Sequence, residues 1–183
     1  MIFGKTNNYY SIEAIEAVLK TINLTVPIEK KHFLILSLLY ETGARVNEII
    51  HVKVEDIDLS SNPHIKLKSL NTTRTVSLSN QVTKLIRQHI TTNGLLDNQR
   101  LFYRALNISC AELCRYLGIY IKRARIKHPN LIPDFDSIRG FRISRANHLH
   151  QAGLSMEELC YMLGHKNTNQ TKRYIGILYH ASS

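Results

Sequence analysis

The chain has 183 residues, of which 44% are hydrophobic and 21% charged, and its formal net charge is +10. This composition excludes a fibrous or disordered protein, and the length suffices for one domain with a hydrophobic core. A basic excess of this size makes a polyanion the leading partner, although a basic domain without a nucleic-acid role stays open on charge alone.

The positive charge is concentrated in the second half of the chain. Residues 103–183 hold 12 Lys and Arg against 5 Asp and Glu, whereas residues 1–102 hold 12 against 9. We therefore expect a positive face to be built mainly from the second half.

The three cysteines, Cys110, Cys114 and Cys160, fit a reducing cytosol better than a disulfide framework. Cys110 and Cys114 lie one helical turn apart, but no second pair with metal-ligand spacing accompanies them. We expect both to be buried helix residues, and we predict neither a metal nor a cofactor. No apolar window approaches the ~18 residues of a membrane span, so we expect no signal peptide, no membrane contact and a cytoplasmic location in a prokaryote or a virus-infected host cell.

The first elements in chain order are two helices. Residues 1–10 are polar and aromatic and are predicted to form a short arm. Apolar residues recur at helical spacing over residues 11–23, and a second helix begins at Pro27 and stops at Gly43. The second helix carries the apolar run 33–39, which is too continuous for a surface helix and is predicted to be the buried centre of the domain.

A short helix and a hairpin are predicted next. Arg45 stands at the start of the short helix, where it is either an active arginine or a surface residue paired with Glu48. Residues 52–59 are predicted to be extended or turn-rich, and two strands are predicted around residues 65–68 and 74–78. Lys66 and Lys68 then share one face of the hairpin, as cleft residues or as edge-strand lysines that block aggregation.

The second half predicts further helices separated by one irregular connector, residues 95–106. Their expected spans are 79–93, 107 or 109 to 127, 136 or 137 to 151, 155–163 and 169–178. The helix that ends at 127 closes with four basic residues in six positions, a density that suggests phosphate contacts. We see no break that would separate two domains, so the fold class is mainly α with a small antiparallel β-sheet.

Polar residues of the first half and of the last quarter of the chain together have the chemistry for metal-free cleavage of a phosphodiester. Arg45 and Arg142 can clamp both non-bridging oxygens, because the arginine fork gives paired charge-assisted hydrogen bonds. His165 can donate a further hydrogen bond or handle a proton, and Lys68 can protonate the leaving 5′ oxygen. Tyr174 can be the nucleophile and form a covalent phosphotyrosine.

Three segments resemble the sequence boxes of the tyrosine recombinases, also called phage-type integrases. Residues 42–49, T-G-A-R-V-N-E-I, are similar to the first arginine box of that family. Residues 139–142, R-G-F-R, resemble its H-x-x-R box, with Arg142 standing 23 residues before His165. Leu163-Gly164-His165, with Tyr174 nine residues later, resembles the final histidine and nucleophile.

The resemblance, over residues 11 to 178, implies a catalytic-domain fold in which Arg45 and Arg142 bind the scissile phosphate. It implies that Lys68 is the hairpin general acid, with Lys66 as its rival. It also implies that His165 assists at the phosphate and that Tyr174 attacks it.

Two departures from the family pattern stand out. Arg139 occupies the histidine position of the H-x-x-R box; it can bind phosphate there but cannot act as a base at neutral pH. Only about 40 residues precede Arg45, so we expect a single catalytic domain over residues 1–183, without an N-terminal core-binding domain and with a short tail over residues 179–183.

The expected partner is double-stranded DNA, bound by a homo-oligomer that is a tetramer in synapsis, with a monomer as the expected free form. Further DNA contacts are predicted from basic residues near the boxes and in the cluster that closes at residue 127: Lys66, Lys122, Arg123, Arg125, Lys127, Arg145, Lys172 and Arg173.

The sequence therefore predicts a site-specific recombinase or integrase that rejoins DNA strands through a 3′-phosphotyrosine. Two alternatives stay open: a non-catalytic DNA-binding protein that keeps the fold, and a strand transferase like the type IB topoisomerases.

Overall fold

The fold is built around helix α2 (Pro27–Thr42). The structure is a computed structural model that describes residues 9–69, 72–102 and 109–176. Pro27 is favourable in the first turn of α2, because a backbone N–H there would have no partner within the helix. Gly43 ends it in the left-handed conformation, with φ of 59°. The leucines and isoleucine over residues 34–39 are all buried, so the predicted central helix is confirmed.

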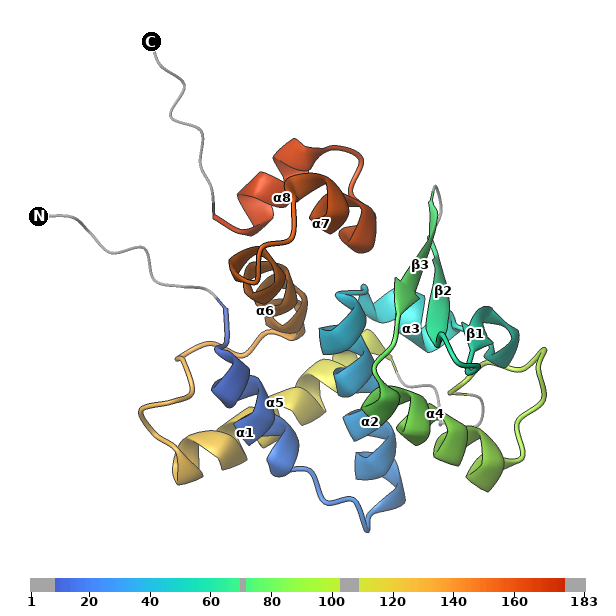
Figure 1. The fold of residues 1–183 in the computed structure, drawn as a ribbon. Helices are drawn as coiled ribbons and strands as arrows, with labels where there is room; N and C mark the ends of the chain where they lie inside the picture. Colours follow the sequence, from blue (N-terminus) through green and yellow to red (C-terminus); the bar gives the residue numbers. More distant parts are fainter. Residues whose placement is uncertain (1–8, 70–71, 103–108, 177–183) are drawn as a thin grey trace, which may run out of the picture.

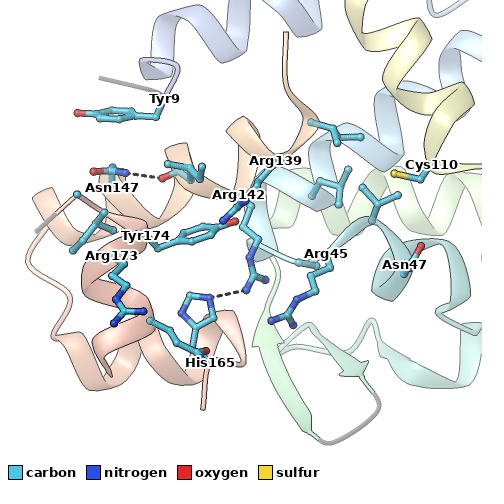
Figure 2. A pocket seen from close by; sticks show the side chains of 18 residues that line it. Tyr9, Arg45, Asn47, Cys110, Arg139, Arg142, Asn147, His165, Arg173 and Tyr174 are labelled. Atoms are coloured by element: carbon cyan, nitrogen blue, oxygen red, sulfur yellow. Dashed lines mark hydrogen bonds between the residues drawn. The ribbon is translucent and has the colours of Figure 1, made fainter. Parts of the chain in front are cut away.

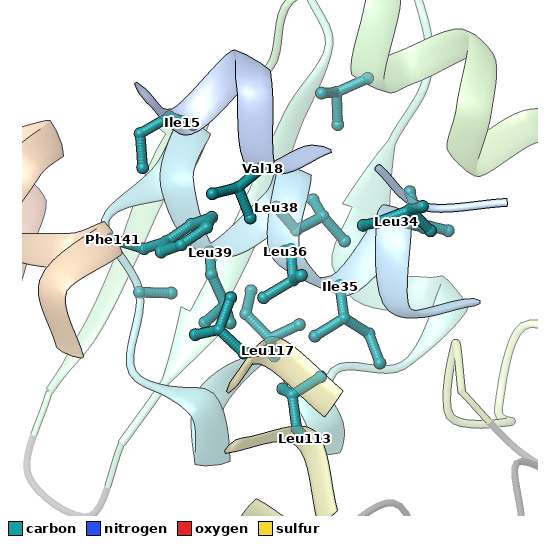
Figure 3. Close-up of a cluster of buried hydrophobic side chains, with 14 of the residues drawn as sticks. Ile15, Val18, Leu34, Ile35, Leu36, Leu38, Leu39, Leu113, Leu117 and Phe141 are labelled. Carbon is teal, nitrogen blue, oxygen red and sulfur yellow. The ribbon is translucent and has the colours of Figure 1, made fainter. Parts of the chain in front are cut away.

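The other α-helices of the described residues follow in chain order: α1 (Ile12–Lys20), α3 (Val46–His51), α4 (Asn80–Asn93), α5 (Cys110–Lys127), α6 (Ile138–Gln151), α7 (Met156–Leu163) and α8 (Thr168–Tyr174). Helices α1, α3, α4 and α6 contact α2, while α5 packs on α1 and α8 on α7 (Figure 1). Buried side chains of α1, α2, α5 and α6 meet in one core (Figure 3). The prediction of a mainly helical fold with a small sheet is confirmed.

The sheet is antiparallel, in the order β1 (Ile57–Asp58), β2 (His64–Lys68), β3 (Thr73–Ser77), and a short 3₁₀ helix, η1 (Val54–Asp56), precedes it. The β2–β3 register places Lys68 opposite Thr73. Lys66 and Lys68 lie on the exposed face and alternate with buried residues, as the period of two predicts. The first strand was not predicted, because two residues are too short to leave a periodic signal.

Several predicted boundaries shift in the structure. The last helix ends at Tyr174, earlier than the predicted end at 178, and residues 177–178 lie outside the described residues. Ser109, not Asn107, caps α5; Asn107 also lies outside the described part. The predicted arm does not extend to Tyr10, which is fully buried.

The prediction that Cys110 and Cys114 are buried is wrong. Both are exposed, because they lie in the first turns of α5 and outside its buried stripe, and Cys110 also lines a pocket. Within the described residues, no three His, Cys, Asp or Glu side chains gather where a metal ion could be held. Over the same ranges, no helix combines the length and the apolar character that a bilayer crossing requires.

Candidate active site

A pocket with a volume of about 1130 Å³ lies between parts of the chain that are far apart in sequence. One wall comes from the α2–α3 turn and the start of α5, and the other from α6, α8 and the α7–α8 connection (Figure 2). Its charged and aromatic lining residues are Tyr9, Arg45, Arg139, Arg142, His165, Arg173 and Tyr174. The structure thus brings together all the predicted catalytic residues except Lys68.

Arg142 is the buried member of this set, with 5% of its surface exposed. Its Nη1 donates to the carbonyl oxygen of Gly43 at 2.5 Å, and its Nη2 to that of Leu163 at 2.6 Å. Burial lowers the pKa of Arg142 to about 10, so the guanidinium stays charged at neutral pH. Among the described residues, no Asp or Glu forms an ion pair with Arg142. Its positive charge is therefore available to pair with a bound anion.

Arg45 is held at the opposite wall by its own backbone. It is the N-cap residue of α3, and its N–H donates to Glu48 Oε2 at 2.7 Å. Its Nη1 also donates to Glu48 Oε1, at 3.3 Å, while 46% of the side chain is exposed. Arg45 therefore pairs with Glu48 and also lines the pocket, and its role as an active arginine stays a prediction.

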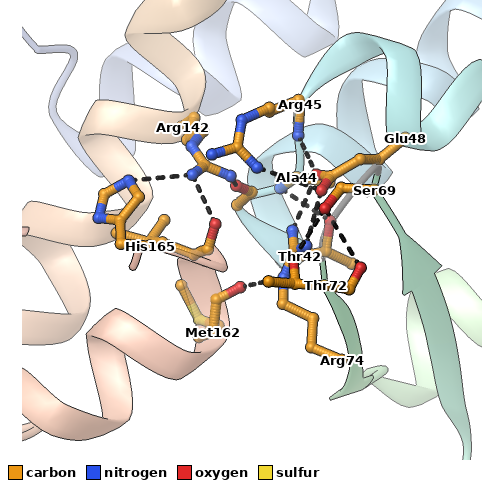
Figure 4. A network of polar contacts seen from close by, with 12 residues as sticks. Thr42, Ala44, Arg45, Glu48, Ser69, Thr72, Arg74, Arg142, Met162 and His165 are labelled. Atoms are coloured by element: carbon orange, nitrogen blue, oxygen red, sulfur yellow. Dashed lines mark hydrogen bonds and ion pairs between the residues drawn. The ribbon is translucent and has the colours of Figure 1, made fainter. Parts of the chain in front are cut away.

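A buried ion pair behind Arg45 was missed in the sequence. Arg74 of β3 is 2% exposed. Its Nη1 donates to Glu48 Oε1 at 2.7 Å and its Nη2 to Glu48 Oε2 at 2.8 Å (Figure 4). Its Nε donates to the carbonyl oxygen of Met162, at the end of α7, at 2.6 Å. The signal was present: on β3, Arg74 alternates in phase with Val76, on the buried face of the strand.

His165 follows Gly164, which ends α7 in the left-handed conformation at φ of 62°. Its Nε2 lies 3.1 Å from Arg142 Nη2, and its Nδ1 lies 3.0 Å from Thr171 Oγ1. Because arginine only donates, Nε2 accepts and the proton is on Nδ1. Burial, and then the surrounding arginines, lower the pKa of His165 to about 4, so the ring is neutral at pH 7.

Tyr174 is the last residue of α8, whose start is capped by Asn167. Its ring meets that of His165 edge to face, with centroids 5.3 Å apart. The guanidinium carbons of Arg139 and Arg142 lie 5.2 and 5.6 Å from the centroid of the Tyr174 ring. The residue at the usual histidine position, Arg139, is thus a direct neighbour of the expected nucleophile.

Lys68 lies apart from this group. Its Nζ forms an ion pair with Asp56 Oδ1 at 2.5 Å, and it is not among the described residues that line the pocket. Hydrogen bonding to Asp56 raises the pKa of Lys68, so the lysine is held as a cation. Its rival Lys66 lines a second hollow, of about 380 Å³, together with Asp56 and Asp58.

Apart from Lys66, the predicted DNA-contact residues fall into three groups. Arg173 is exposed and lines the pocket, and Lys172 beside it is half-buried. Arg145 is directed back to α2, where its Nε donates to the carbonyl oxygen of Glu41 at 3.0 Å. The basic cluster at the end of α5 begins roughly 18 Å along the helix axis from Cys110. Its Arg125 donates to the carbonyl oxygen of Phe135, three residues before Ile138, which lines the pocket.

Within that cluster, two arginines are engaged in the protein itself. Arg123 forms an ion pair with Glu29 at 3.1 Å, and Arg125 forms one with Asp136 at 2.9 Å. Lys122 and Lys127 are exposed. The lysines are therefore better placed than the arginines to meet a phosphate.

Comparison with known proteins links the whole site to one family. The phage integrase family model matches residues 10–180. Tyrosine recombinase XerC of Staphylococcus carnosus is 26% identical over 168 residues, which cover 91% of this chain and 56% of the relative. XerD of Staphylococcus epidermidis is 30% identical over 177 residues, covering 93% of this chain and 58% of the relative. The chain thus spans somewhat more than half the length of these relatives.

A solved structure agrees on the fold. The Tn1549 transposon integrase, in complex with transposon right end DNA, matches with a TM-score of 0.75 at 17% identity, covering 100% of this chain and 65% of that one. The family model spans both walls of the pocket, from Tyr10 to beyond Tyr174. On this evidence, the chain belongs to the phage integrase family.

Proposed function

We propose that this chain is the catalytic part of a site-specific DNA recombinase that cleaves and rejoins DNA strands through a 3′-phosphotyrosine at Tyr174. One observation carries the proposal: the Tyr174 ring lies against His165, Arg139 and Arg142 in one pocket. The curated relatives named as tyrosine recombinases, and the integrase structure that contains DNA, support DNA as the substrate.

In the proposed step, the Tyr174 oxygen forms a bond to phosphorus while the bond from phosphorus to the 5′ oxygen breaks. The tyrosine loses one proton and the leaving oxygen gains one, so the step balances without a further reactant. Negative charge grows on the two non-bridging oxygens. Arg142 and Arg45 stabilise that charge from opposite walls, and Arg142 is already fixed at Gly43 and Leu163.

Arg139 and His165 have different parts in this proposal. Arg139 is a permanent cation and serves as an electrostatic ligand of the phosphate or of the charged tyrosine oxygen. His165 is neutral before DNA binds, and its Nε2 lone pair faces Arg142. A bound phosphate would attract a proton to Nε2, so that the ring donates to a phosphate oxygen.

Lys68 remains the proposed general acid, with Lys66 as its rival. For that role Lys68 has to leave Asp56 and turn toward the pocket when DNA is bound. The Lys68 side chain is 55% exposed and free to turn, but Asp56 is only 8% exposed. The release of Lys68 therefore leaves a nearly buried carboxylate, which still accepts from the N–H of Lys53, and the bound DNA phosphate has to offset that cost.

The remaining parts of the proposal concern assembly and binding. Lys122, Lys127, Lys172 and Arg173 are proposed to contact the DNA backbone outside the scissile phosphate. The active assembly is proposed to be a tetramer on two duplexes, which size-exclusion chromatography with light scattering on synapsed DNA would detect.

The decisive experiment uses a nicked suicide DNA substrate, which traps the covalent adduct. The protein is expected to form an adduct, and Tyr174→Phe is expected to form none. Tyr161→Phe is the matched control, because Tyr161 is 59% exposed on α7 and does not line the pocket. An adduct that persists in Tyr174→Phe would show that another residue is the nucleophile.

Two other outcomes would redirect the assignment. Salt-sensitive DNA binding without an adduct on any substrate would identify a non-catalytic DNA-binding protein. Adduct formation and supercoil relaxation without a preferred site would identify a type IB topoisomerase-like activity.

A further inference from the structure

Tyr10 is a fully buried tyrosine that the proposed chemistry does not use. Its OH donates to the carbonyl oxygen of Phe135 at 3.0 Å and accepts from the N–H of Ser137 at 3.2 Å. Its own N–H donates to Ser144 Oγ at 2.8 Å. These contacts reach more than 120 residues along the chain, to the segment just before α6 and to Ser144 within that helix.

The Tyr10 ring occupies a space that Gly140 leaves open. A Cβ atom at residue 140 would lie 2.6 Å from Tyr10 Cε2, and 3.1 Å from Cε2 of Phe135. Gly140 lies within α6, so it is needed for room and not for a left-handed backbone. The Tyr10 and Phe135 rings pack with centroids 4.6 Å apart, which leaves the tyrosine little freedom to withdraw.

Gly140 directly follows Arg139 and stands two residues before Arg142, in the first turn and a half of α6. Ser144, which accepts from Tyr10, donates in turn to the carbonyl oxygen of Gly140 at 2.7 Å. Tyr10 therefore contacts the part of α6 whose backbone carries both arginines.

The neighbouring Tyr9 contacts the other end of the same helix. Its OH accepts from Gln151 Nε2 at 3.0 Å, and its ring meets His148 edge to face, with centroids 5.8 Å apart. The two consecutive tyrosines thus hold α6 near both ends.

We infer that Tyr10, seated against Gly140, is a positioning residue that sets the location of Arg139 and Arg142 relative to Tyr174 and His165. This inference rests on the proposed function for its kinetic readout. Burial raises the pKa of Tyr10 to about 12, so its OH remains a hydrogen-bond donor throughout the useful pH range.

The test is a mutant cycle on covalent adduct formation with the nicked DNA substrate. Gly140→Ala is expected to lower the cleavage rate at saturating DNA by roughly 100-fold, because a displacement near 1 Å of the reacting groups has an effect of that size. DNA affinity, measured by fluorescence anisotropy, should change far less. Tyr10→Leu lacks Cε2, so the Tyr10→Leu/Gly140→Ala double variant is expected to recover about tenfold of the lost rate.

Gly118→Ala is the matched control. Gly118 also lies within a helix, but a Cβ there would meet only Asp136 Oδ2 at 3.8 Å, an ordinary contact. It is expected to cleave like the parent protein. Circular dichroism establishes that each variant is folded before its rate is measured.

A second readout separates this inference from the proposed function. The nitrogen shifts of the His165 imidazole report whether Nε2 still accepts from Arg142, whether or not the protein cleaves DNA. Gly140→Ala is expected to change these shifts and the double variant to restore them. A parent protein without any adduct would contradict the function alone. Two results would overturn the role of Tyr10. One is a folded Gly140→Ala variant with unchanged His165 shifts and an unchanged cleavage rate. The other is a double variant that cleaves no faster than Gly140→Ala.

Discussion

Arg74 and Arg142 are both buried arginines beside the same pocket, and they differ in what surrounds their charge. Arg74 is paired with the carboxylate of Glu48 through two hydrogen bonds. Arg142 is bound instead by two backbone carbonyl oxygens and by the neutral ring of His165. One guanidinium already has its anion, whereas the other has hydrogen-bond acceptors that carry no full charge.

This difference assigns the two arginines to different tasks. The Arg74–Glu48 pair joins β3 to α3 and, through the carbonyl oxygen of Met162, to the end of α7. It therefore fixes the two walls of the pocket relative to each other. Arg142 keeps its charge for a ligand. We expect substitution of Arg74 or Glu48 to affect stability first, and substitution of Arg142 to affect activity first.

The largest expected effect is on catalysis, from Arg142→Lys. Lysine keeps the charge but loses the planar fork that holds Gly43 and Leu163 together. The rate of adduct formation is expected to fall on the order of 1000-fold, as for other arginines that stabilise phosphoryl transition states. Arg100→Lys, at an exposed position, is the control and should retain the rate. A loss below tenfold would mean that Arg142 does not bind the scissile phosphate.

The next effect is on folding, from Glu48→Gln. The change leaves Arg74 buried without a counter-charge, which typically costs about 3–5 kcal/mol in the free energy of unfolding. Urea denaturation followed by circular dichroism measures this cost. Glu55→Gln, which removes an exposed pair with Lys53, should change the same free energy by less than about 1 kcal/mol. Equal effects of the two substitutions would contradict the structural role of the buried pair.

The smallest effect concerns pH and His165. Its pKa is about 4 in the folded protein and 6.5 in the unfolded chain, so the unfolded state binds the proton first as pH falls. Stability is therefore full above about pH 6.5 and declines toward pH 4. After allowance for solvent around a half-buried ring, the decline from this residue is about 1–2 kcal/mol.

His165→Asn isolates this contribution. Burial also lowers the pKa values of His32, His89 and His148, so the parent protein loses stability at acid pH for several reasons. The difference between parent and variant, measured from pH 7 to pH 4, is the quantity to compare. Parallel pH profiles would show that His165 is not held neutral by Arg142 and its surroundings.

Local sequence rules predicted much of the fold, and the resemblance to a family indicated most of the charged residues that line the pocket. The predicted helices that begin at residues 11, 79 and 155 are found, and Ser11, Ser79 and Ser155 cap them, because a cap depends only on neighbouring residues. His165 and Tyr174 are joined by one short helix, so their spacing in sequence nearly determines their proximity.

The parts that failed depend on contacts between distant segments. The strand pattern placed Lys68 on the correct face, but its partner Asp56 comes from η1, before β1, and no local rule selects it. Cys110 and Cys114 have helical spacing that fits burial, yet whether another element covers them is decided by the tertiary fold. Tyr10 was assigned to a polar arm because the residue that leaves room for its ring, Gly140, lies 130 positions later in the chain. No local pattern connects the two.

The two carbonyl oxygens that hold Arg142 belong to the last turns of helices: Gly43 caps α2 and Leu163 is the final residue of α7. A helix carries roughly half a negative charge at its C-terminal end, so two helix dipoles converge on one guanidinium. They stabilise the guanidinium as a cation without a carboxylate, which could be protonated and would add a full negative charge beside an incoming phosphate. Helix N-termini commonly bind anions directly. In this protein, two helix C-termini instead bind a cationic side chain, which can in turn bind an anion.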